Sequence, residues 1–104
     1  MVNKLPLTQL SLLEKLHLET AKMNWLELQP FFAKGSVLII DQSLDLIQIA
    51  VDFAEDHTEK LSVPIEQKLI AAPTNELARQ WYDQKECLWT VVVSPFVLVQ
   101  EIKK

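Results

Sequence analysis

The segment from Val91 to Val99 constrains the fold of this chain most, because Ser94 is the single break in an otherwise apolar run. A strand with one face in water alternates apolar and polar residues, so this run places apolar side chains on both faces of its sheet. Burial of one Val, Leu or Phe side chain stabilises a fold by roughly 1.5–3 kcal/mol. We therefore expect both faces to be covered, either by helices on each side or by a second copy of the chain on one side.

The sequence around this run predicts an antiparallel hairpin. Two β-rich segments, 88–93 and 96–101, flank a Ser-Pro dipeptide, and such segments on either side of a turn signal are typical of a hairpin. A proline at the second loop position fits a type I turn poorly, so the connection is a cis turn, a bulge or a sharp bend of an edge strand. In a tight register, Trp89 lies opposite Gln100.

An apolar stripe with alternating steps of three and four residues predicts an amphipathic helix near the start of the chain. Its members are Leu18, Ala21, Trp25, Leu28 and Phe32. Pro30 should kink or end this helix, and Gly35 marks its exit. The β-branched run from Ser36 to Asp41 is bounded by turn residues and predicts a buried strand.

Residues 44–55 fit both a helix and a strand. Polar side chains recur on one side of a helix for four turns, whereas the alternation typical of a strand stops before the segment ends. The helix is favoured, with Ser43 as its cap. Its inner side is expected to carry Leu46, Ile47, Ala50, Phe53 and Ala54. Asp56 and Glu59 have the spacing of a capping box, which predicts a further helix that Pro64 breaks or restarts.

The remaining segments complete a single α+β domain over residues 1–104. Residues 69–72 are expected to form a minor strand, and Thr74 is expected to cap a helix over about 75–85. The Leu-rich segment 1–17 is expected to form a short helix over about 11–17. We expect a small, mainly antiparallel sheet with a C-terminal hairpin, packed by four to five helices.

The composition excludes several functions. Gly35 is the one glycine, whereas a phosphate-binding loop, a dinucleotide fingerprint and a nucleophile elbow each need two or more. The net charge of −4 argues against nucleic acid, because Lys and Arg supply most of that affinity. No apolar run is long enough to span a membrane. Cys87 is the one cysteine, so no internal disulfide forms, and no signal peptide is recognised; we expect a cytoplasmic protein.

The most concentrated polar feature is an acidic stripe, which consists of Asp45, Asp52, Glu55, Asp56 and Glu59. Clustered carboxylates could hold a hard cation or meet a basic partner, but the solvated face of an amphipathic helix explains them better. His57 adds a ligand type without a second His or Cys nearby, so we expect no metal and no cofactor. Cys87 could act as a nucleophile beside His17 or His57, yet a small buried hydrophobe is commoner at the entry to an apolar strand. We predict no catalytic residue.

The three tryptophans have different expected roles. Trp25 and Trp81 lie on helix faces assigned to the core. Trp89, near the start of the hairpin, suits either the core or an interface, where tryptophan is enriched. Gln100 and Glu101 end the apolar run and are expected to be exposed.

The chain resembles a bacterial family of short proteins known as domain of unknown function 2288. The residues that carry the resemblance are Leu18-Glu19-Thr20-Ala21, Trp25, Glu27-Leu28, Phe31-Phe32-Ala33, Gly35, Leu44-Asp45-Leu46, Phe53-Ala54-Glu55-Asp56, Pro73-Thr74, Glu76, Trp81, Leu88-Trp89, Val91-Val92-Val93, Pro95 and Val97-Leu98-Val99-Gln100-Glu101. The resemblance covers residues 18–101. Pro64 and Lys68 depart from the family pattern, which has Trp and Gly there, and this argues against a regular helix over 57–68. The family has no assigned activity, so no catalytic residue carries over.

Two functional hypotheses follow from the sequence. The first is a non-enzymatic interaction module, acting as a homodimer, whose acidic helix or strand edge meets another protein. Its candidate surface comprises Asp45, Asp52, Glu55, Asp56, Trp89, Gln100 and Glu101. The second is a small-molecule or metal-binding enzyme, which requires Glu55, Asp56 and His57 to converge in one concave pocket.

Overall fold

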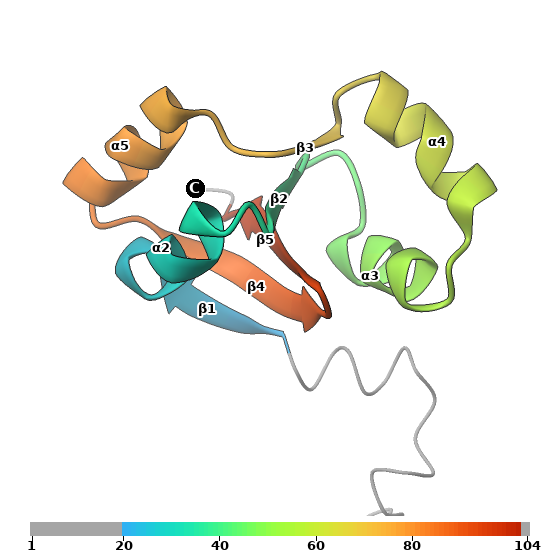
Figure 1. Ribbon diagram of the computed structural model, residues 1–104, viewed down its shortest axis with the longest axis horizontal. Coiled ribbons are helices and arrows are strands. Elements are labelled where there is room, and N and C mark those ends of the chain that lie inside the picture. The colour runs from blue at the N-terminus through green and yellow to red at the C-terminus, as the bar shows by residue number, and fades with distance from the viewer. Residues whose placement is uncertain (1–19, 103–104) are drawn as a thin grey trace, which may run out of the picture.

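A mixed five-stranded sheet runs through the centre of the computed structural model, which describes residues 20–102 and places two helices on each face of the sheet (Figure 1). The elements in chain order are β1 (Ala21–Asn24), α2 (Trp25–Ala33), β2 (Val37–Ile40), α3 (Leu46–Ala54), α4 (Thr58–Glu66), β3 (Ile70–Ala71), α5 (Asn75–Asp83), β4 (Cys87–Val93) and β5 (Phe96–Glu101). The helix expected over 11–17 lies outside the described residues.

The strand order is β1-β4-β5-β2-β3. The predicted hairpin is confirmed as β4 and β5, with Trp89 opposite Gln100, and the Ser94–Pro95 peptide bond is cis. The expected mainly antiparallel sheet is wrong, because β2 runs parallel to β5 and the sheet is mixed. Three helices separate β2 from the hairpin in the chain, so β5 can return beside β2 in the same direction. A short apolar run does not indicate whether its strand will lie parallel or antiparallel to a neighbour, so the sequence alone does not predict the parallel pairing of β2 with β5.

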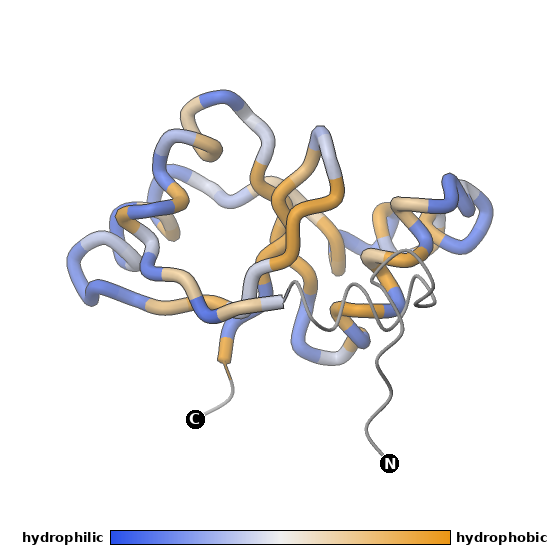
Figure 2. Tube along the Cα trace, turned by 90° about the horizontal axis from the view of Figure 1, so that it is seen from below, coloured by the Kyte–Doolittle hydropathy of each residue, from blue (hydrophilic) through white to orange (hydrophobic). Residues whose placement is uncertain are grey.

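Side chains from the sheet alternate between two hydrophobic clusters. On one face, Val91 and Leu98 pack with α3 and α4; on the other, Val97 and Val99 pack with α2 and α5. Figure 2 shows the apolar strands in the centre, between two groups of helices. The apolar strand residues of the run 91–99 are buried or half-buried except Val92, which is 53% exposed. Helices of the same chain therefore cover both faces, and no second copy is needed for that purpose.

The first amphipathic helix begins later than expected. Residues 21–24 form β1 and pair with β4, and the helix starts at Trp25. Asn24 provides the cap: its backbone is extended, and its side chain accepts a hydrogen bond from the Leu26 amide at 2.9 Å. Over four residues, the period of a strand is hard to distinguish from the period of a helix. Hydrogen bonding to β4 selects the strand. Pro30 stays inside α2 rather than ending it.

The helix assignment for residues 44–55 is confirmed, but its cap is Asp45 rather than Ser43. The following helix, α4, is regular from Thr58 to Glu66, so the argument against a regular helix over 57–68 is wrong. The expected capping box is also wrong, because Asp56 adopts a positive φ of 59° at the end of α3. The minor strand β3 and the Thr74 cap of α5 are confirmed.

All four helices of residues 20–102 end in the same motif. The residue after each C-cap has positive φ, and its amide donates a hydrogen bond to the carbonyl oxygen three residues earlier. The amide of the following residue donates to the carbonyl oxygen five residues before it, as in a Schellman motif. Those four positions are Gly35, Asp56, Lys68 and Lys85. Glycine adopts this left-handed conformation without the Cβ clash that other residues suffer. Three of the four ends are therefore strained.

Lys68→Gly is expected to stabilise the protein by about 0.5–1 kcal/mol, because φ at Lys68 is 61°. Urea denaturation followed by tryptophan fluorescence measures the change. Lys60→Gly is the matched control: it lies inside α4, is exposed and should destabilise by about 1 kcal/mol. Destabilisation by both substitutions would contradict the assignment of strain to Lys68.

Candidate functional site

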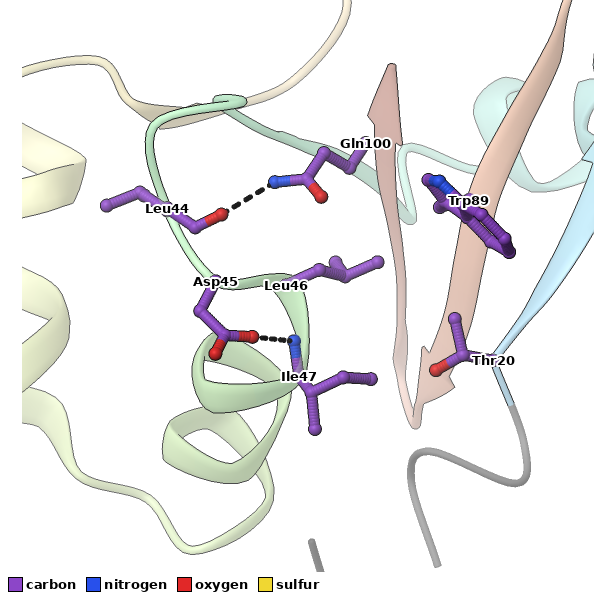
Figure 3. A pocket seen from close by; sticks show the side chains of 7 residues that line it. All are labelled: Thr20, Leu44, Asp45, Leu46, Ile47, Trp89 and Gln100. Carbon is purple, nitrogen blue, oxygen red and sulfur yellow. Dashed lines mark hydrogen bonds between the residues drawn. The ribbon is translucent and has the colours of Figure 1, made fainter. Parts of the chain in front are cut away.

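A pocket of about 380 Å³ opens beside the N-terminus of α3, on the sheet face that α3 and α4 cover. Its lining residues are Thr20, Leu44, Asp45, Leu46, Ile47, Trp89 and Gln100 (Figure 3). We call it the Trp89 pocket. Three of the seven candidate surface residues from the sequence meet here, contributed by the α3 N-terminus, β4 and β5.

The side chain of Gln100 is held in one orientation. Its Nε2 donates hydrogen bonds to the carbonyl oxygens of Leu44, at 2.8 Å, and Asp41, at 3.0 Å. A flipped amide would place Oε1 against these two carbonyl acceptors, so the flip is excluded. Oε1 faces away from Leu44, toward the space between Leu46 and Trp89 (Figure 3). Gln100 thus presents a fixed hydrogen-bond acceptor to the pocket.

Asp45 adds a carboxylate at the same pocket. Its Oδ1 accepts the cap hydrogen bonds from the backbone amides of Ile47, at 3.0 Å, and Gln48, at 3.3 Å. Those bonds hold the carboxylate at the start of α3 and leave Oδ2 without a hydrogen bond to any residue from 20 to 102. The carboxylate is exposed, so a ligand can reach it.

Trp89 forms the apolar wall of the pocket and is half-buried. The register of β1, β4 and β5 aligns Lys22, Trp89 and Gln100 in one cross-strand row. The Lys22 ammonium lies 5.1 Å from the centroid of the indole ring, a distance typical of a cation–π interaction. The indole face therefore already contacts one cation in this fold.

The pocket adjoins a second cavity of about 430 Å³ that shares Trp89 and Gln100. Glu101 lines this second cavity and is exposed, as expected, whereas Gln100 was expected to be exposed and is half-buried by its contacts with Leu44 and Asp41. Asp41 lies next to Gln100 and carries a further carboxylate. Hydrogen bonds from the side chain and the backbone of Ser43 lower the pKa of Asp41 below 3.8. Asp41, Asp45 and Glu101 thus place three carboxyl groups near the pocket, against the one ammonium of Lys22 beside Trp89.

Ser43→Ala is expected to raise the pKa of Asp41 toward 3.8 without reaching it, because the backbone amide at position 43 still donates to the carboxylate. The hydrogen bond from the Ser43 side chain to the ionised Asp41 carboxylate stabilises the fold above pH 3.8. This contribution is lost as the pH falls through the lowered pKa of Asp41 in the folded state. An NMR titration of the Asp41 carboxyl carbon measures the change. Ser62→Ala, which removes a hydroxyl bonded to Glu59 in α4, should leave this pKa unchanged; an equal shift would contradict the assigned cause.

The rest of the acidic stripe lies elsewhere. Asp52 was expected on the solvated face of the helix, but it is buried, at 4% exposure. Its Oδ1 accepts a hydrogen bond from Gln48 Nε2 at 3.2 Å and lies 3.1 Å from His57 Nδ1. Glu55 Oε1 lies 3.8 Å from the other nitrogen of His57. A buried carboxylate requires such partners, so Asp52 and His57 join the C-terminal end of α3 to the loop before α4.

The grouping that the enzyme hypothesis requires is not formed. Asp56 lines a cavity of about 370 Å³ beside the tip of the β4–β5 hairpin, and neither Glu55 nor His57 lines it. Among residues 20–102, no three His, Cys, Asp or Glu side chains form a group that could hold a metal ion. Cys87, expected as a buried hydrophobe, is exposed.

Sequence reasoning missed part of the Trp89 pocket. Thr20 and Leu44 line it, and Lys22 contacts its tryptophan. No local pattern identifies Lys22, because it reaches the site through the pairing of β1 with β4, and Thr20 immediately precedes that strand. The hairpin register was the available signal, since it predicted that Trp89 and Gln100 are neighbours.

Comparison with known proteins assigns the chain to a family without a known activity. A family model described as "Protein of unknown function (DUF2288)" matches residues 11–101. The NMR solution structure of PA1075 from Pseudomonas aeruginosa superposes with a TM-score of 0.77 and 38% sequence identity, over 92% of this chain and 90% of that chain. No curated protein matches. None of the helices within residues 20–102 has the length and apolar character needed to cross a membrane. The resemblance seen in the sequence is thereby confirmed, and the chain belongs to the DUF2288 family.

Proposed function

We propose that this protein is a non-enzymatic interaction module that binds a basic side chain of a partner protein in the Trp89 pocket. The observation that carries the proposal is the fixed Oε1 of Gln100, in a cavity that Asp45 and Trp89 also line. Two oxygen acceptors beside an aromatic wall favour a group that donates several hydrogen bonds and carries positive charge. An arginine side chain has this chemistry, since its planar guanidinium donates five N–H groups and stacks on aromatic rings.

Charge supports a basic partner over a second copy of the same chain. The net charge is −4, and Asp41, Asp45 and Glu101 lie around the pocket. Two such surfaces repel each other, whereas a basic segment is attracted. The homodimer expected from the sequence relied on an uncovered sheet face, and helices of this chain occupy both faces. We therefore take the partner to be another protein, and light scattering over a range of concentrations tests for self-association.

The experiment that tests the proposal titrates isotope-labelled protein with N-acetyl-arginine amide and follows the indole N–H signal of Trp89 by NMR. We expect this signal to move with saturation at millimolar concentrations. Asp45→Asn keeps a side chain that caps helices well but removes the charge. It should weaken binding about fivefold, which corresponds to roughly 1 kcal/mol.

Two further variants make the test specific. Glu55→Gln is the matched control, because it removes one negative charge from the end of the same helix, away from the pocket. It should leave the affinity within about twofold. Trp89→Leu keeps an apolar wall but removes the aromatic ring, and we expect about a tenfold loss. An unmoved Trp89 signal, or equal losses for Asp45→Asn and Glu55→Gln, would refute the proposal.

A further inference from the structure

The cavity of about 370 Å³ beside the tip of the β4–β5 hairpin is mainly apolar, and we call it the hairpin-tip pocket. It lies on the sheet face that α3 and α4 cover. The rings of Phe53 and Phe96 line it with their centroids 5.5 Å apart, so one wall is aromatic. Six of its nine lining residues are apolar, namely Phe53, Leu61, Ile65, Val93, Pro95 and Phe96.

The apolar walls of the hairpin-tip pocket stay partly open to solvent within residues 20–102. Ile65 is 48% exposed on α4, and Phe53 and Phe96 are half-buried. Single exposed apolar side chains are common on proteins, whereas a group of them around one cavity is typical of a binding surface. The hairpin-tip pocket therefore suits an apolar occupant.

The chain before Thr20 enters the fold toward this pocket. In the antiparallel pairing of β1 with β4, Ala21 lies opposite Thr90 and Lys22 lies opposite Trp89. Each step back along β1 is therefore a step along β4 toward the hairpin tip, and β1 begins toward the C-terminal end of β4 (Figure 1). Thr20 lines the Trp89 pocket, which lies on the same sheet face as the hairpin-tip pocket.

The segment that leads to Thr20 is rich in leucine: five of the nine residues from 10 to 18 are Leu. In the helix predicted over about 11–17, Leu12, Leu13 and Leu16 share one face, and we call them the leucine stripe. The family model begins at residue 11, so this segment belongs to the family's domain. A covalently linked segment has an effective concentration of about millimolar or more, which favours it over a separate apolar partner.

We propose that residues 11–17 dock in the hairpin-tip pocket, with the leucine stripe facing its aromatic wall. Two residues before Thr20, the continued register of β1 brings Leu18 opposite Val93, whose side chain lines the pocket. Leu16 is two residues further back and so at most about 7 Å from Leu18, which lets it reach the pocket without a change in β1. This docking does not depend on the function proposed for the Trp89 pocket.

NMR of the full chain with labelled leucine methyl groups tests the docking directly. We expect nuclear Overhauser effects from Leu13 and Leu16 to the rings of Phe53 and Phe96. Leu7 is the matched control, because it precedes the family match, and it should show none. Absence of these effects, or equal ones from Leu7, would overturn the proposal. A mixture of labelled and unlabelled chains tests for a second copy, and effects seen between different molecules would overturn it as well.

Substitution provides an independent measurement. Leu16→Ala should raise the equilibrium constant of unfolding in urea about tenfold, because it removes apolar contact from the pocket, and Leu7→Ala should change it less than twofold. In an Ile65→Ala background, where the pocket has lost part of its wall, the effect of Leu16→Ala should shrink to about threefold or less. An undiminished tenfold effect would show that Leu16 packs elsewhere. Binding of arginine at Trp89 is a separate readout, so either proposal can fail without the other.

Discussion

Leu98→Ala is expected to lower the free energy of unfolding by about 2–5 kcal/mol. Leu98 is fully buried in β5, which pairs with β4 on one side and β2 on the other. Its side chain belongs to the cluster under α3 and α4, so its removal leaves a cavity that neighbouring strands cannot close easily. Urea denaturation followed by circular dichroism measures the loss. For a domain with about 5–15 kcal/mol of stability in total, this is a large fraction.

Val92→Ala is the control for Leu98→Ala. Val92 lies on the neighbouring strand of the hairpin, and its side chain is 53% exposed, so we expect a loss below about 1 kcal/mol. Both measurements should be independent of protein concentration, because helices of the same chain cover the sheet. A midpoint that rises with concentration would show that a second copy contributes to this core.

Trp81→Ala is expected to destabilise the protein by about 3–5 kcal/mol, through the opposite face of the sheet. Trp81 is 2% exposed on the inner side of α5 and meets Trp25 edge to face, with ring centroids 4.9 Å apart. An aromatic pair of this kind contributes about 0.5–1.5 kcal/mol beyond the burial of its area. Thermal unfolding followed by circular dichroism detects the change as a lower Tm.

Tyr82→Ala is the matched control for Trp81→Ala. Tyr82 is the next residue in α5, and its side chain is 51% exposed, so we expect less than about 1 kcal/mol of destabilisation. Trp81→Phe, which keeps an aromatic ring, should lie between the two alanine variants. Similar losses for Trp81→Ala and Tyr82→Ala would mean that α5 does not cover this face of the sheet as described.

The elements predicted correctly from the sequence have strong local signals. Thr74 caps α5, and its hydroxyl accepts a hydrogen bond from the Leu77 amide at 3.1 Å. The hairpin follows from two β-rich runs around a Ser-Pro turn, and its register places Trp89 opposite Gln100. Caps and turns depend on interactions between residues close in the sequence, so the sequence is sufficient to identify them.

The elements predicted wrongly depend on distant partners. Residues 21–24 satisfy a helical period but pair with β4 as an edge strand. Asp52 fits the polar face of α3, yet it is buried because His57 and Gln48 supply hydrogen bonds to it. The helix over 58–66 forms although Pro64 lies within it. In each case tertiary contacts outweigh a local preference worth about 1–3 kcal/mol.

The amino-acid order by itself required an apolar environment above and below residues 91–99, because consecutive apolar residues in a strand face both ways. It did not determine whether helices or another subunit provide that environment. The tertiary structure decided this by distributing the helices over both faces, and it ran β2 parallel to β5. The same arrangement brought Asp45 to Trp89 and Gln100. Proximity between residues more than forty positions apart depends on strand order, which short apolar segments do not encode individually.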